Sequence, residues 1–159
     1  MKWIKACLMA AVTCLFSSSP LAQQPNVAET SVLQSIMQYW EARNAGDWEA
    51  AFVMESTAGL ITSQSDGSFH KPLGYKRDLS GQAVNVNVYY PEATEISPGV
   101  VYARYYIEGL IGAGSERYQY RSRITNVWVR EGQEWRMRGA HYSDGNYGRT
   151  RRTLDEDFN

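Results

Sequence analysis

Apolar residues recur at helical spacing early in the chain, from Glu29 onward. Thr30 or Ser31 is the predicted N-cap of this helix. Gly46 suits the position just past its end, and Asp47 suits the N-cap of a second, short helix. The apolar positions follow the i, i+3, i+4, i+7 pattern of an amphipathic helix with a wide core-facing stripe: Val32, Leu33, Ile36, Met37, Tyr39 and Trp40.

From residue 84 onward the pattern changes to the two-residue alternation that is typical of strands. Turn-forming residues separate the alternating segments. Before them, the Asp66-Gly67 turn signal predicts a short strand or hairpin over 59–69. Two helices followed by antiparallel strands predict one α+β domain. The main strands are predicted over 84–90, 93–97, 100–112, 116–130 and 134–143.

The strand predicted over 100–112 has two faces that are both partly apolar. One carries Val101, Ala103, Tyr105, Ile107 and Ile111, and the other carries Tyr102, Arg104, Tyr106 and Glu108. Such a strand is expected in a sheet that helices cover on one side and a partner subunit covers on the other. The alternative is a solvated outer face that is rich in tyrosine.

The first 22 residues resemble a secretory signal peptide. Lys2 and Lys5 precede an apolar run over 6–16, which is too short for a permanent membrane span, and small residues up to Ala22 suit cleavage. We therefore expect a secreted or periplasmic protein, with no membrane contact once residues 1–22 are removed. Cleavage also removes Cys7 and Cys14 and leaves a chain without thiols or disulfides.

Charge argues against nucleic acid as a partner. The net charge of the full chain is −1, and because the leader holds two basic and no acidic residues, the remaining chain carries −3. Residues 23–28 are expected to form a linker. Residues 146–159 hold a basic cluster followed by an acidic cluster, and we expect a charged, partly disordered tail there.

Two motifs resemble the nuclear transport factor 2-like superfamily, particularly its SnoaL-like branch. "QYWEARNAGDWEAAF" (38–52) is similar to its first two helices, and "TNVWVREGQEWRMRGAHYS" (125–143) is similar to its closing hairpin. The ending is also similar to the calcium/calmodulin-dependent kinase II association domain. The resemblance implies, over 29–145, a cone-shaped curved antiparallel sheet around N-terminal helices, with a pocket at the wide mouth. It also implies a homodimer through the outer sheet face.

The family includes enzymes, and the ketosteroid isomerases among them can be tested residue by residue. Tyr39 matches their hydrogen-bond donor to the enolate oxygen. The position of the general base falls at Ser63, which cannot abstract a carbon-bound proton, and the second acid falls at Asn126. Only one of three roles is met, so this isomerase chemistry is not expected. The epoxide hydrolase branch needs paired aspartates, and only Arg77-Asp78 stands in the middle of the chain.

The polyketide cyclase branch uses an Asp or a His near the pocket mouth, and here His141 is the candidate. Strand parity places it on the same face as Trp135 and Met137, which is expected to point into the cone. An imidazole in an apolar pocket can act as a base near neutral pH. The alternative, which we favour, is a structural hydrogen bond across the core.

The remaining polar groups point to no cofactor or metal. His70 and His141 are far apart in a mature chain without cysteine, and "GLIGAGS" joins two strands instead of opening a helix. Arginines occur in alternating pairs on the last strands. For the pair on the final strand, parity favours an outer position, with Glu108 or Glu116 as partners. These pairs are Arg121 with Arg123, and Arg136 with Arg138.

The first functional hypothesis is a cofactor-free domain that binds a small, partly apolar molecule. Its predicted pocket wall consists of Tyr39, Trp48, Tyr105, Asn126 and His141. The second is a cyclase, isomerase or dehydratase with His141 as acid or base and Tyr39 as hydrogen-bond donor. The third is a non-catalytic assembly module whose cone is filled by its own aromatic residues. Burial of Tyr39 and His141 distinguishes these hypotheses. An open cavity lined by both favours binding or catalysis, whereas a cone filled by Tyr39 and Trp40 favours assembly.

Overall fold

The structure is a computed structural model, and it describes residues 26–65, 69–70, 82–113 and 116–144. The predicted leader (1–22) and the predicted tail (146–159) lie outside the described residues.

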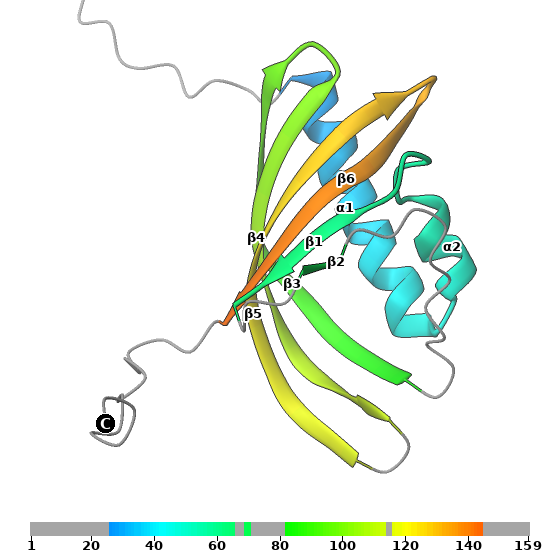
Figure 1. The fold of residues 1–159 in the computed structure, drawn as a ribbon. Coiled ribbons are helices and arrows are strands. Elements are labelled where there is room, and N and C mark those ends of the chain that lie inside the picture. Colours follow the sequence, from blue (N-terminus) through cyan, green and yellow to red (C-terminus); the bar gives the residue numbers. More distant parts are fainter. Residues whose placement is uncertain (1–25, 66–68, 71–81, 114–115, 145–159) are drawn as a thin grey trace, which may run out of the picture.

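Two helices lie on one side of a curved six-stranded sheet (Figure 1). The strand order is β2-β1-β6-β5-β4-β3, and every neighbouring pair is antiparallel except β1 and β6, which run parallel. The predicted α+β cone with a single domain is therefore confirmed, although its sheet is mixed at one edge. The elements are α1 (Val27–Ala45), α2 (Trp48–Val53), β1 (Ile61–Gln64), β2 (Phe69–His70), β3 (Gln82–Ser97), β4 (Val100–Ala113), β5 (Glu116–Glu131) and β6 (Glu134–Asp144).

The first helix begins earlier than the apolar stripe indicates. Asn26 is the N-cap: its side chain accepts a hydrogen bond from the backbone N–H of Glu29, whose carboxylate accepts one from the Asn26 N–H in return. This reciprocal capping box satisfies two N–H groups that the helix leaves open, so it outcompetes the predicted caps Thr30 and Ser31. Residues 26–28 thus belong to the domain and not to a linker.

The junction between the two helices is as predicted. Gly46 ends α1 with a φ of 75°, which a residue without Cβ adopts at little cost. Asp47 caps α2, and its carboxylate accepts a hydrogen bond from the Ala50 N–H at 3.0 Å. The chain therefore turns sharply here and lays α2 beside α1.

The two strands predicted over 84–90 and 93–97 form one long strand, β3. Its pairing with β4 shifts register between Tyr89 and Glu92, and Tyr90 has a φ of 51° there. This irregularity bends the strand without ending it, because pairing resumes on the far side. The expected hairpin over 59–69 is confirmed as β1 paired with β2, and β2 contains His70.

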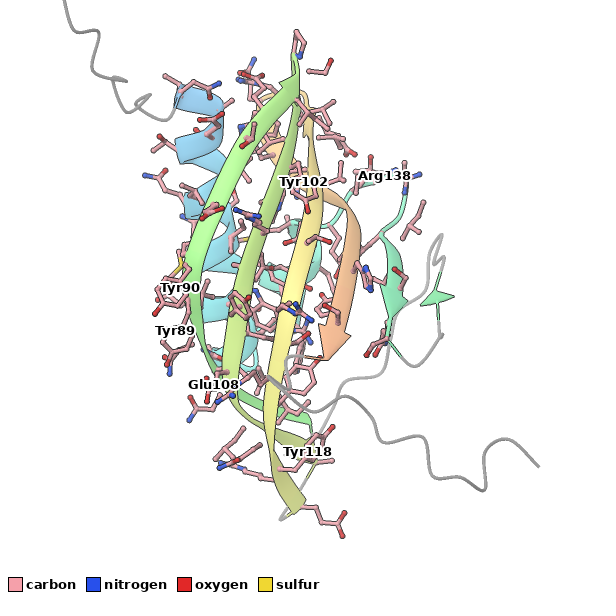
Figure 2. All side chains as sticks on the ribbon, turned by 90° about the vertical axis from the view of Figure 1, so that its left-hand side faces the viewer. Tyr89, Tyr90, Tyr102, Glu108, Tyr118 and Arg138 are labelled. Carbon is pink, nitrogen blue, oxygen red and sulfur yellow. The ribbon has the colours of Figure 1, made fainter. Side chains whose placement is uncertain are left out.

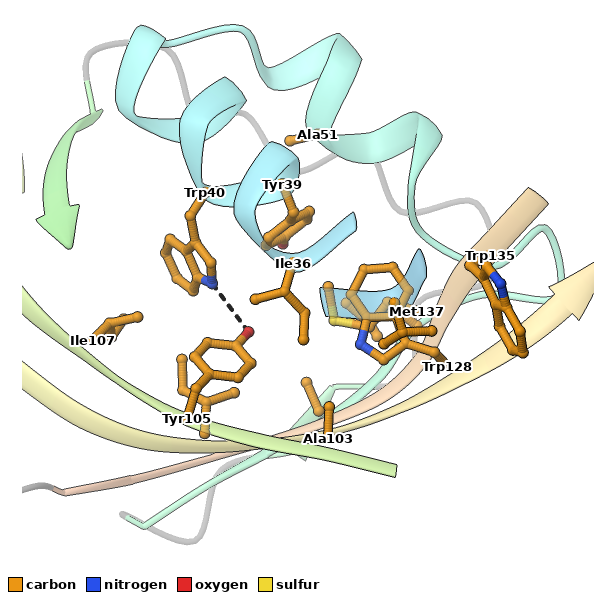
Figure 3. Packing of buried hydrophobic residues seen from close by; sticks show 14 of the residues in the cluster. Ile36, Tyr39, Trp40, Ala51, Ala103, Tyr105, Ile107, Trp128, Trp135 and Met137 are labelled. Atoms are coloured by element: carbon orange, nitrogen blue, oxygen red, sulfur yellow. Dashed lines mark hydrogen bonds between the residues drawn. The ribbon is translucent and has the colours of Figure 1, made fainter. Parts of the chain in front are cut away.

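The core lies between α1 and the concave face of the sheet (Figure 3). Ile36, Tyr39 and Trp40 from α1 are buried there, as the helical spacing predicts. Trp40 and Tyr105 are joined by a hydrogen bond from the indole N–H to the phenol oxygen, 3.0 Å long. The inner face of β4 is the predicted one, with Val101, Ala103, Tyr105 and Ile107 buried.

The opposite face of the sheet has no covering element among the described residues (Figure 2). Tyr89, Tyr90 and Tyr102 are exposed on it, beside an ion pair between Arg104 and Glu92 at 2.6 Å. Within the described part of the chain, no helix is both long and apolar enough to cross a membrane.

Candidate functional site

A cavity of about 420 Å³ lies where α1 ends, β3 and β5 begin, and β4 and β6 end. Its walls combine apolar side chains with tyrosine hydroxyls, one amide and one guanidinium. Two further hollows adjoin it. One of about 760 Å³ shares Gln64, Tyr120 and Tyr142 with it, and one of about 500 Å³ shares Arg43 and Val84. The residues that line it include Trp40, Arg43, Gln64, Ile107, Ile111, Tyr120 and Tyr142.

Strand register explains why these side chains meet. Tyr105, Ile124, Tyr142 and Gln64 are partners in sequence across β4, β5, β6 and β1 and form one row across the sheet. Tyr105 and Ile124 in this row are buried beneath Trp40, whereas Tyr142 and Gln64 reach the cavity. The row therefore forms the boundary between the filled core and the open end of the cone.

Arg43 is the charged group of the cavity. It lies in the last turn of α1, and its guanidinium carbon is 5.5 Å from the ring centre of Tyr39, 4.9 Å from that of Trp40 and 5.3 Å from that of Trp48. Its Nη1 donates a hydrogen bond to the Tyr39 hydroxyl at 3.1 Å. Stacking of this kind stabilises a cation when it is removed from water.

The guanidinium remains charged despite its surroundings. Burial lowers the pKa of Arg43, but its interactions with Tyr39, Tyr142 and Glu55 outweigh that effect and raise the pKa above its ordinary value. Burial also raises the pKa of Tyr120, on the cavity wall. The described wall of the cavity therefore offers the Arg43 cation beside tyrosine hydroxyl groups.

Tyr39 is not on the cavity wall where it was predicted. Its side chain is 1% exposed and packs edge-on against Trp40, with ring centres 5.6 Å apart. Its hydroxyl already has two partners, because it accepts from Arg43 and lies 3.4 Å from the Glu55 carboxylate, to which it donates. This part of the cone is thus filled by aromatic residues, as the assembly hypothesis expects.

The predicted inner position of His141 is wrong. The pairing of β5 with β6 shifts register between Val127 and Trp128, so Arg138 is an extra residue and the alternation of faces changes after Met137. Ala140 is consequently buried, and His141 is exposed on the outer face. Acid–base catalysis inside the cone requires the imidazole to lie near the Tyr39 hydroxyl. The structure does not bring these two groups together.

The other predicted wall residues belong to the core or its edge. Tyr105 is buried, and burial raises the pKa of its hydroxyl well above the ordinary value, which keeps it neutral as an acceptor for Trp40. Asn126 is 1% exposed and donates to the Met137 sulfur at 3.2 Å. Trp48 is half-buried beneath Arg43. Tyr105 and Asn126 do lie on the inner face, but the sequence could not distinguish the filled interior from the open one.

The structure also shows where the isomerase base position and the arginines of the last strands lie. Ser63, at the isomerase base position, is exposed on β1. Glu108, which was predicted to pair with the arginines of the final strand, pairs with Arg121 of β5 instead, at 2.5 Å. Arg138 lies on the outer side and donates to the Gly59 carbonyl. No group of three or more His, Cys, Asp and Glu side chains suited to a metal ion occurs within the described ranges.

Arg43, Gln64, Tyr120 and Tyr142 were not predicted as site residues. A signal for Arg43 exists in the sequence, because Tyr39 and Trp40 precede it by one helical turn and Trp48 follows it. Tyr142 could not have been found by alternation, since the bulge in β6 reverses its face.

No family model matches the sequence, and no curated protein is similar to it at the sequence level. Solved structures are similar in fold. A ketosteroid isomerase-like protein from Erwinia carotovora atroseptica superposes with a TM-score of 0.64 at 11% identity, over 75% of this chain and 97% of its own. A nuclear transport factor 2-like protein from Cytophaga hutchinsonii gives 0.60 at 14% identity, over 71% and 94%.

An assigned calcium/calmodulin-dependent kinase II association domain from Exiguobacterium sibiricum gives a TM-score of 0.62 at 12% identity, over 77% of this chain and 97% of its own. At identities this low, the superpositions show a shared fold and leave the activity open. The chain has the cone fold shared by nuclear transport factor 2-like proteins, ketosteroid isomerase-like proteins and these association domains.

Proposed function

We propose that the protein binds a small, partly apolar molecule in the 420 Å³ cavity at the end of α1. The observation that carries this proposal is the composition of the cavity wall. Trp40, Ile107 and Ile111 supply apolar surface, and Tyr120 and Tyr142 add hydroxyl groups. Small-molecule sites are commonly concave and mostly apolar, with a few polar groups, and occupy about 300–1,000 Å³.

Binding of this kind needs no cofactor. Catalysis by His141 with Tyr39 is the less favoured alternative, because one side chain lies outside the cone and the other is in the core. The predicted leader is the basis for proposing that binding takes place in the periplasm or outside the cell.

Filling the cavity is expected to abolish binding. Ile111 lines the cavity and is half-buried, so an Ile111→Trp side chain can extend into it. We expect N-phenyl-1-naphthylamine, a neutral apolar dye, to fluoresce strongly with the wild-type protein and at least 10-fold less with this variant. Ile96→Trp is the matched control, because Ile96 is 61% exposed and belongs to neither the cavity nor its two adjoining hollows.

Circular dichroism establishes that both variants are folded. Equal dye fluorescence in wild type and Ile111→Trp contradicts the proposal. Native mass spectrometry of protein purified from its own periplasm is the companion measurement, and a retained small molecule is the expected result.

We also propose a homodimer through the outer face of the sheet. Tyr90 is 79% exposed although its backbone is held at a φ of 51°, a conformation that costs an aromatic residue about 1–3 kcal/mol. The described core makes no use of its ring. Tyr102 and Tyr89 are exposed on the same face (Figure 2), and association domains are among the similar folds. Exposed aromatic patches commonly mark protein–protein contacts.

A charge on this face is expected to separate the subunits. We expect the wild type to sediment as a dimer and Tyr102→Glu to sediment as a monomer at the same concentration. Val53→Glu is the control, because Val53 is 55% exposed on α2, away from the outer sheet face. A wild-type monomer at micromolar concentration contradicts this proposal and leaves the cavity proposal intact.

A further inference from the structure

Arg43 has hydrogen-bonding capacity that the described protein does not use. A guanidinium has five N–H donors in a planar fork. The bond to the Tyr39 hydroxyl takes one of them, and the Nε atom is buried with no hydrogen-bond partner among the described residues. Leaving a buried donor without a partner is unfavourable, and more so when the donor belongs to a charged group.

The charge of Arg43 also has no direct counterion among the described residues. Within the described ranges only two ion pairs occur, Arg104 with Glu92 and Arg121 with Glu108, both on exposed side chains. The Tyr39 hydroxyl is hydrogen-bonded both to Arg43 and to the carboxylate of Glu55. A cation in a partly dry site is stabilised much more by an anion that is hydrogen-bonded to it directly than by one that contacts it through another group.

The location of Arg43 gives an anion a place to bind. Arg43 lines the 420 Å³ cavity and also the 500 Å³ hollow beside it. An anion on its guanidinium has Trp40, Ile107 and Ile111 as apolar neighbours within the same cavity. Tyr120 and Tyr142 line the same cavity.

We propose that the ligand of this cavity is a small organic carboxylate with an apolar body, whose carboxylate pairs with Arg43 while its body contacts Trp40 and Ile111. This inference rests on the proposed binding function and specifies its ligand class. A monoanion fits better than a dianionic phosphate, because Arg43 supplies the one positive charge among the described residues that line this cavity. The last turn of α1 also carries partial negative charge, which disfavours a second negative charge there.

Arg43 could instead serve only to stabilise the C-terminal end of α1, where it lies in the last turn. A cation in the last turn of a helix is stabilised by the partial negative charge of that end, without any ligand. That effect acts on stability alone and gives no preference between charged and neutral ligands, so binding measurements distinguish the two roles.

The test compares 2-naphthoate with 2-naphthalenemethanol, two ligands of similar shape of which only the first is charged. Isothermal titration of the protein at pH 7 is expected to give at least 10-fold tighter binding of 2-naphthoate. In Arg43→Met, which keeps an apolar stem and good helix propensity, we expect this ratio to fall to about one. Arg130→Met is the matched control, because Arg130 also lies over a tryptophan ring, Trp135 at 5.9 Å, but outside the cavity.

The outcomes separate this inference from the function on which it rests. Equal affinity of the wild type for the two ligands overturns the anion proposal and retains the binding function. An unchanged ratio in a folded Arg43→Met variant also overturns it. Failure of the wild type to bind either ligand, together with the absence of dye binding, overturns the binding function itself. The wild-type ratio decides the question even if Arg43→Met does not fold.

Discussion

Replacing Trp128 by alanine is expected to lower the free energy of unfolding by about 3–5 kcal/mol. Trp128 is 0% exposed and is the largest fully buried side chain of the described core (Figure 3). Truncation removes its apolar surface from the core and leaves a cavity that the rigid sheet cannot close. Because a domain of this size is stable by about 5–15 kcal/mol, the variant loses a large part of its stability. Urea denaturation followed by circular dichroism measures the loss.

Trp128→Phe is the control that separates volume from hydrogen bonding. The indole Nε1 of Trp128 is buried and has no hydrogen-bond partner among the described residues. Phenylalanine keeps most of the ring volume and removes this unpaired donor, so we expect a loss below about 1.5 kcal/mol. A loss for Trp128→Phe as large as that for Trp128→Ala indicates a partner for the indole N–H outside the described residues and contradicts the packing argument.

Element type and core faces could be predicted because each depends on local chemistry. The apolar spacing in α1 selects the buried Ile36, Tyr39 and Trp40. Gly46 and Asp47 mark the helix junction because the conformation of one and the capping ability of the other depend on few neighbours. Strand alternation likewise identifies the inner face of β4, where pairing with β5 continues without a register shift.

The candidate site was predicted poorly because it depends on interruptions of these patterns. One extra residue in β6, Arg138, exchanges the faces of every residue after it and moves His141 outside. Nothing in the alternation of side chains signals that residue, since Trp135 and Met137 continue to fit the inner face. The parity argument was sound as far as Met137 and failed beyond it.

The sequence also does not distinguish residues of the filled core from residues that line the open cavity. Tyr105 and Tyr142 belong to the same row across the sheet, yet one is buried under Trp40 and the other lines the cavity. The difference arises from where α1 ends above the sheet, which only the packing of helix against strands decides. Resemblance to relatives assigned roles to Tyr39, whereas the packing assigns the cation of the cavity to Arg43, one turn further along the same helix.

The substitution Gly109→Ala is expected to destabilise the domain by about 3 kcal/mol, although it adds only one methyl group. A Cβ at Gly109 lies 2.1 Å from the Asn85 carbonyl oxygen and 2.7 Å from the Val86 Cα. Both are backbone atoms of β3, so the clash cannot be relieved by a side-chain rotation, and the two paired strands must separate. Thermal and urea denaturation measure the change.

Gly139→Ala is the matched control, because it adds the same methyl group to the neighbouring part of the same sheet. A Cβ at Gly139 has its nearest contacts at 3.8 and 4.0 Å, within ordinary van der Waals distance, and we expect a change within about 0.5 kcal/mol. Because both substitutions replace glycine in a strand by alanine, their difference isolates the close approach of β3 to β4. Equal effects of the two substitutions contradict that close approach. They also argue against the cavity wall that Val84 of β3 and Ile111 of β4 form beyond it.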